Sequence, residues 1–77
     1  MSLTALIDYL HSVMNGKPEG IERRALQLFR ARHPDNKIIQ LTGDSVLRSV
    51  IEKTAAYSDS IAEAWIDCLK RAIKEAE

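Results

Sequence analysis

The stretch that decides the fold is 60–76, SIAEAWIDCLKRAIKEA. Apolar side chains recur in it every three or four residues, which predicts a helix. They form two adjacent stripes, whereas a surface helix of a globular protein usually carries one stripe, about 100° wide. We therefore expect this helix either to lie at the centre of a bundle or to share its apolar face with a second chain. The two stripes are Ile61, Trp65, Cys68 and Ala72, and beside them Ala62, Ile66, Leu69, Ile73 and Ala76.

The same spacing predicts two helices in the first half of the chain. One covers about residues 3–15, and Asn15 and Gly16 are suited to end it because both tolerate a left-handed backbone. The other begins at 18 or 20 and ends at 32, since Pro34 disfavours helical conformation in the residue before it. The expected inward residues are Leu3, Leu6, Ile7, Leu10, Val13 and Met14 in the first helix, and Ile21, Ala25, Leu28 and Phe29 in the second.

A third helix is predicted over about residues 45–57, with Thr42 or Asp44 as its N-cap. Residues 34–44 before it are too apolar for a free loop, so we expect them to pack as a short helical turn or an extended plug. A further cap, Ser58-Asp59-Ser60, precedes the last helix. The expected inward residues are Ile38, Ile39 and Leu41 in the connecting segment, and Val46, Leu47, Val50, Ile51 and Thr54 in the third helix.

These elements predict an all-α fold, a small compact four-helix bundle formed by one helical domain over residues 1–77. The segment around residues 36–41 is a candidate for a short extra helical turn. Neighbouring helices are expected to be mostly antiparallel, because the connections before the second and the fourth helix are short.

The overall charge of the chain is balanced. Its formal net charge is zero, and residues 17–48 carry seven Lys and Arg against four Asp and Glu. This local excess is mild, so we expect no specific nucleic-acid binding. Apolar runs are far shorter than the roughly 20 residues that span a bilayer, so we expect no membrane contact. A lone Cys68 and the lack of an apolar leader favour a cytoplasmic location.

Residue types that carry out catalysis are sparse. His11 and His33 are the two histidines, and a proline-bearing connection separates them. No paired Cys or His spacing suits a metal, and no glycine-rich loop suits a phosphate. Cys68 lies on an apolar helix face, where a cysteine usually acts as a small buried hydrophobe. We therefore expect no enzyme, no catalytic residue, no metal, no cofactor and no small-molecule substrate.

The tripeptide His33-Pro34-Asp35 ends the basic second helix. Its simplest interpretation is a helix stop. A histidine interacts well with the negative end of the helix dipole, the proline blocks extension, and Asp35 with Asn36 favours a turn.

The same residues support an alternative. The stretch resembles the J-domain of heat-shock co-chaperones, in which a basic helix ends in a His-Pro-Asp loop. Arg23, Arg24, Arg30 and Arg32 match the basic helix, Ile21 and Leu28 lie where that family places apolar residues, and AAYSD at 55–59 is similar to its third helix. The resemblance implies that His33, Pro34 and Asp35 contact an ATPase partner. The chain departs from the family at Arg32, commonly aromatic there, and at Phe29, commonly small.

A second alternative is a weak helix-turn-helix-like nucleic-acid binder around residues 38–52, with Gly43 between two helical segments. Asp44 and Glu52 would face phosphates unfavourably in that arrangement. We therefore favour a non-enzymatic protein–protein interaction or regulatory module, whose partner is another protein or a second copy of the chain in a helix-mediated homodimer. The candidate partner-binding residues are Arg30, Arg32, His33, Asp35, Lys37, Trp65, Ile66 and Leu69.

Overall fold

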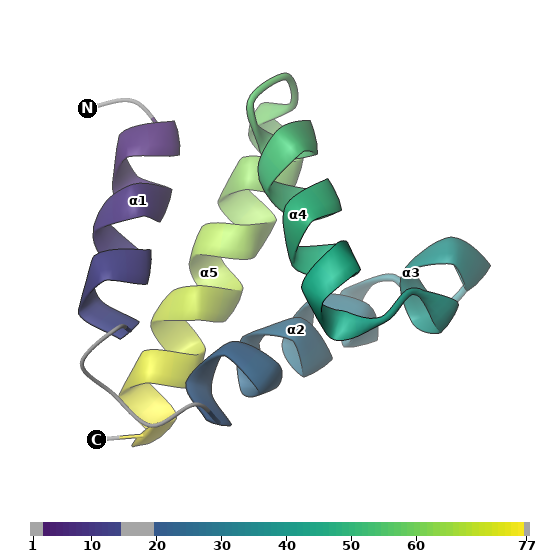
Figure 1. The fold of residues 1–77 in the computed structure, drawn as a ribbon, viewed down its shortest axis with the longest axis horizontal. Coiled ribbons are helices and arrows are strands. Elements are labelled where there is room, and N and C mark those ends of the chain that lie inside the picture. The colour runs from purple at the N-terminus through teal and green to yellow at the C-terminus, as the bar shows by residue number, and fades with distance from the viewer. Residues whose placement is uncertain (1–2, 15–19, 77) are drawn as a thin grey trace.

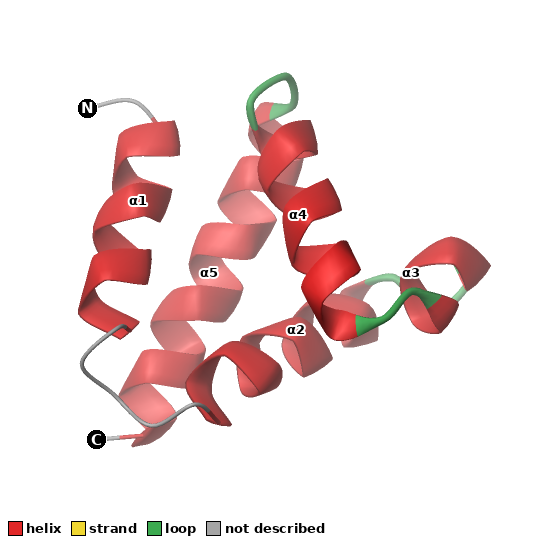
Figure 2. Cartoon of the chain, in the orientation of Figure 1, coloured by secondary structure: helices red, strands yellow, loops and turns green. Residues whose placement is uncertain are grey.

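The computed structural model describes residues 3–14 and 20–76. This part of the chain forms five helices and no strand (Figure 2). Figure 1 shows α1, α2 and α4 arranged around α5, while the short α3 projects beside the start of α4. The predicted all-α bundle and its extra helical turn are therefore confirmed. The helices are α1 (Leu3–Met14), α2 (Gly20–Arg32), α3 (Lys37–Leu41), α4 (Asp44–Ala55) and α5 (Asp59–Ala76).

The last helix, α5, is central. Trp65 and Leu69 are 0% exposed, and the remaining buried residues of both stripes are covered by α1, α2 and α4. Of the two expectations for its wide apolar face, the structure shows the first, a helix at the centre of the bundle. Helix α2 runs antiparallel to it, because Arg24 pairs with Glu75 whereas Arg32, further along α2, pairs with Asp67. None of the helices in the described part of the chain is long and apolar enough to cross a membrane.

Two details of the predicted core in α1 and α2 can be compared with the structure. Ile7 and Leu10 of α1 are buried, as expected. In α2 the fourth fully buried position is Leu26, and the expected Leu28 is only partly buried. Helix α2 is contacted by α4 as well as by α5. Its buried face is therefore wider than expected and includes Leu26. Asn15, Gly16 and Pro18, which were expected to separate the two helices, lie outside the described residues.

Helix α4 is rotated about its axis relative to the expected orientation. Val46 and Val50 were predicted to face the core, but they are 58% and 48% exposed. Leu47 and Ile51 are buried, as expected, and the third buried residue is Ala55. The half-buried side of α4 is polar, since Arg48 and Glu52 turn towards α1 and α2. Thr54, also predicted to point inward, is exposed.

Two further expectations are corrected by the structure: the residue that caps α4 and the burial of α3. The N-cap of α4 is Gly43 without a side-chain bond, so neither Thr42 nor Asp44 caps it. Asn36 caps α3 by accepting a bond from the Ile39 backbone N–H at 3.1 Å, and Ser58 caps α5 by accepting one from Ile61 at 3.4 Å. Ile39 packs against the core as expected. Two neighbours in α3 do not: Ile38 is 76% exposed and Leu41 is 84% exposed.

The orientation of α4 can be tested with two adjacent substitutions. Leu47→Ala removes a fully buried side chain and should lower the free energy of unfolding by about 2–5 kcal/mol. Val46→Ala removes an exposed one and should change it by no more than about 0.5 kcal/mol. Urea denaturation of both variants checks this. A loss for Val46→Ala as large as that for Leu47→Ala would mean that both residues face the core, as first expected.

Candidate functional site

Two groups of polar residues are organised enough to be candidate sites. The first is the turn at His33–Asn36, at the end of α2. The second is a cluster formed by His11, Glu22, Arg48 and Glu52, here called the Arg48 cluster.

The turn has the geometry of a helix stop. The His33 backbone N–H donates to the Arg30 carbonyl at 3.0 Å, and the Asn36 N–H donates to the His33 carbonyl at 3.2 Å. These bonds end α2 and close a turn around the exposed Pro34 and Asp35. The His33 ring packs against Phe29, with 4.8 Å between the ring centroids. The backbone arrangement therefore matches the simplest interpretation of the tripeptide.

Arg30, one of the predicted partner-binding residues, is engaged within the chain. Its guanidinium donates to the Thr42 carbonyl at 2.6 Å and to the Ile39 carbonyl at 3.3 Å, and it pairs with Asp44 at 2.8 Å. The Gln40 amide reinforces the contact by donating to the Arg30 carbonyl at 2.8 Å. Arg30 thus fastens α3 and the start of α4 to the end of α2.

The other predicted partner-binding residues lie in different parts of the structure. Arg32 pairs with Asp67 of α5, while Asp35 and Lys37 are exposed and His33 is half-buried. Three of the set lie in the interior: Trp65 and Leu69 are 0% exposed and Ile66 is 6% exposed. In the monomer a partner cannot reach these three side chains, so the eight residues do not share one surface.

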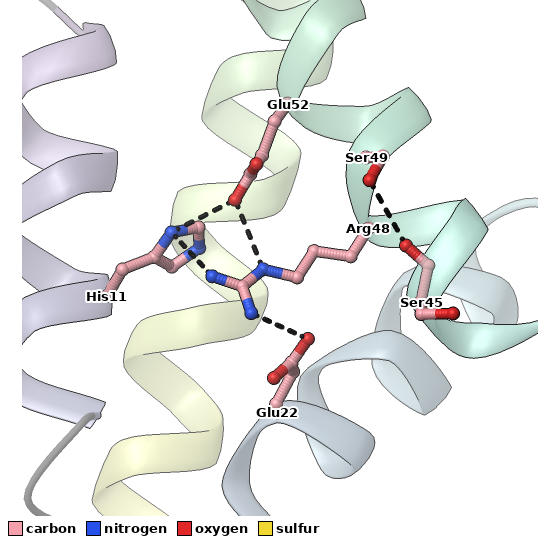
Figure 3. Close-up of polar contacts among 6 residues, drawn as sticks. All are labelled: His11, Glu22, Ser45, Arg48, Ser49 and Glu52. Atoms are coloured by element: carbon pink, nitrogen blue, oxygen red, sulfur yellow. Dashed lines mark hydrogen bonds and ion pairs between the residues drawn. The ribbon is translucent and has the colours of Figure 1, made fainter.

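The Arg48 cluster was not predicted, and it connects three helices (Figure 3). The Arg48 guanidinium of α4 donates to Glu22 of α2 at 3.1 Å and to Glu52 at 3.2 Å. It also approaches Nδ1 of His11 in α1 at 3.3 Å, and the same nitrogen lies 3.0 Å from a Glu52 oxygen. The Arg48–Glu52 spacing of four residues is readable in the sequence, whereas the contacts to His11 and Glu22 depend on how the helices pack.

Burial determines the electrostatics of His11. The side chain is 13% exposed, and its Nε2 is buried without a hydrogen-bond partner among the described residues. Burial lowers the pKa of His11 below its ordinary value, and the positive charge of Arg48 lowers it further. Glu52, Glu22 and Asp8 act in the opposite direction. His11 is therefore neutral at neutral pH.

The chemistry open to the cluster is limited by this burial. A general base must reach the proton of a substrate directly or through one water, and Nε2 of His11 is covered by protein. Across residues 3–14 and 20–76, no group of three or more His, Cys, Asp or Glu side chains is placed to hold a metal ion. The arrangement is suited to joining helices.

Comparison of the chain with protein-family models, with curated proteins and with solved structures finds no match. The resemblance to a J-domain implied a His-Pro-Asp loop after a basic helix. In this fold the basic helix α2 packs mainly against α5, and the loop leads into the five-residue α3.

The contacts of Arg30 lead to a stability prediction. Arg30→Lys keeps the positive charge but cannot supply the same set of bonds, and bonds that involve a charged group contribute about 1.5–3 kcal/mol. We expect the free energy of unfolding to fall by roughly that amount and the amide hydrogens of α3 to exchange faster. The control is Arg23→Lys, at an exposed position of α2, which should change neither quantity. Equal effects at both positions would contradict this role of Arg30.

Proposed function

We propose that the chain is a non-enzymatic protein–protein interaction module that pairs with a second copy of itself through the outer face of α4. This outer face is defined by Val46, Val50, Lys53 and Tyr57. The proposal rests on one observation: Val46, Val50 and Tyr57 are 58%, 48% and 92% exposed although they are large and apolar.

The spacing of these residues places them on one side of the helix. Residues three or four positions apart share a helix face, and Ala56 keeps helical backbone angles beyond the end of α4, so Tyr57 continues the row. Ser45 and Ser49 are also exposed and border this face. Because both side chains are short, another helix could approach the α4 backbone closely.

The free energy of burying this face favours a partner. Fully burying a valine-sized side chain contributes about 1.5–3 kcal/mol, and a pair of copies would cover two valines from each. Within the monomer, the polar contacts of Arg48 and Glu52 hold the opposite side of α4 inward. Within residues 3–14 and 20–76 no element covers the outer face, so a partner could bury it.

Charge and symmetry favour a second copy as that partner. The net charge is zero, so two copies do not repel each other through long-range charge. Two α4 helices packed antiparallel around Val50 would bring Val46 of each copy beside Thr54 and the aliphatic stem of Lys53 of the other. Such a two-fold contact uses the same patch on both subunits.

The proposed dimer contact lies on α4, whereas the sequence placed the expected one on α5. The apolar face of α5, which first suggested self-association, is covered by the other helices of the same chain. Trp65, Ile66 and Leu69 would then support the bundle and would not contact the second copy.

A substitution at the centre of the outer face tests the proposal. Val50→Asp would place two carboxylates against each other at the two-fold axis, so the variant should remain monomeric. Sedimentation equilibrium at tens of micromolar should show dimers for the wild type. The control, Gln27→Asp on the exposed side of α2, should still dimerise.

Disulfide cross-linking tests where the two copies meet. Val50→Cys should form a disulfide-linked dimer under mild oxidation, and Gln27→Cys should not. The native Cys68 is 1% exposed and should not compete. A wild type that stays monomeric at hundreds of micromolar would contradict self-pairing.

A further inference from the structure

We propose that protonation of His11 releases α1 from the bundle, so that the fold opens reversibly as the pH falls below neutral. The inference is independent of the outer face of α4, because His11 lies on the opposite, inner side of that helix. It rests on how α1 is attached and on which atoms surround the His11 ring.

Helix α1 is attached mainly through apolar contacts with α5. Ile7 and Leu10 contribute its buried side chains, and Leu3 and Leu6 pack partly against the same core. His11 adds the polar connection of α1 to α4 (Figure 3). Figure 1 shows α1 at one edge of the molecule, so it can move away without disturbing the contact between α2 and α5.

Neutral His11 fits its surroundings. Its Nδ1 can carry the single ring hydrogen and donate it to the Glu52 carboxylate at 3.0 Å, beside the Arg48 guanidinium at 3.3 Å. The guanidinium also binds Glu22 and Glu52, so one charged group connects α1, α2 and α4. The edge of the His11 ring faces Trp65 of α5, with 6.3 Å between the centroids. Nε2 then carries no hydrogen, and it is buried without a hydrogen-bond partner among the described residues.

Protonated His11 fits worse. Nε2 then carries a hydrogen as well as Nδ1, and none of the described residues accepts it. The new positive charge lies beside that of Arg48, on a His11 side chain that is only 13% exposed. A buried charge with an unpaired N–H is costly. Separating α1 from α4 relieves this by hydrating the imidazolium.

Acidic neighbours limit the effect without removing it. Glu52 and Glu22 face the ring from α4 and α2, and Asp8 lies on α1 itself; all three favour the charged form. From α5 the contact is the uncharged Trp65 ring. Burial and Arg48 outweigh the carboxylates, and the pKa of His11 in the closed fold lies below 6.5.

The sign of the pH dependence follows. With α1 released, His11 is hydrated and its pKa returns to about 6.5, so the open form takes up the proton more readily than the closed form. The closed form is therefore favoured fully above that pH and loses its advantage as the pH falls. The opening equilibrium should rise by at most about tenfold per pH unit, which is the limit for one proton. Opening would uncover Ile7 and Leu10 together with the surface of α5 beneath them.

The test compares three proteins by two-dimensional NMR of backbone amides at pH 7.5 and pH 5. In the wild type, lowering the pH to 5 should raise the opening equilibrium of α1 by up to about 30-fold, seen as relaxation dispersion of the α1 signals that those of α2 and α5 do not show. His11→Gln keeps a side chain that can donate and accept a hydrogen bond but cannot be charged, so its opening equilibrium should be the same at both pH values. His33→Gln is the matched control, and it should open as the wild type does.

A second measurement needs no variant and covers the case in which His11→Gln does not fold. The ring protons of His11 in the wild type should titrate with a midpoint below 6.5 in the closed form. A wild type in which α1 opens no more often at pH 5 than at pH 7.5 would overturn the proposal. So would an His11→Gln variant that opens as readily as the wild type, or an His33→Gln variant that stays closed.

Discussion

The fold depends on the burial of α5 within its own chain. Its two apolar stripes cover about half of the helix, and three other helices are needed to cover them. Trp65 is the centre of this arrangement: it is fully buried, and its ring packs edge-on against those of Phe29 in α2 and His11 in α1. Since α1, α2 and α4 each contact α5, loss of this contact would leave little to hold them together.

Polar contacts then determine how the surrounding helices are turned. Arg48 and Glu52 lie on the side of α4 opposite Val46 and Val50, so both sides cannot face inward. The bonds of Arg48 to Glu22 and His11 turn the polar side inward and leave the two valines exposed. Arg30 acts similarly at the other end of α2, where it fixes α3 and the start of α4. The contacts of both arginines are consistent with the orientation in which Leu47, Ile51 and Ala55 are buried and the two valines remain exposed.

Helix positions and the place of α5 could be predicted from the sequence because they depend on local spacing, on Pro34 and on the double stripe. The rotation of α4 could not. Val46, Leu47, Val50 and Ile51 form a broad apolar arc, and spacing alone does not say which part of it faces the core. The deciding contacts join Arg48 to residues 26 and 37 positions away in the chain. For the same reason, spacing alone does not show that Trp65, Ile66 and Leu69, expected to contact a partner, are buried within the chain. Nor does it show the contacts of Arg48.

The fold described above requires that a single chain covers α5 without help from a second one. Trp65 is the only tryptophan, so its fluorescence reports on this face directly. The most direct measurement is the emission maximum of Trp65 and its quenching by acrylamide, followed by dilution from tens of micromolar to nanomolar at pH 7.5. The account predicts blue-shifted emission and weak quenching that do not change with concentration. Emission that shifts to the red and quenching that increases on dilution would show that a second chain covers α5, and would contradict it.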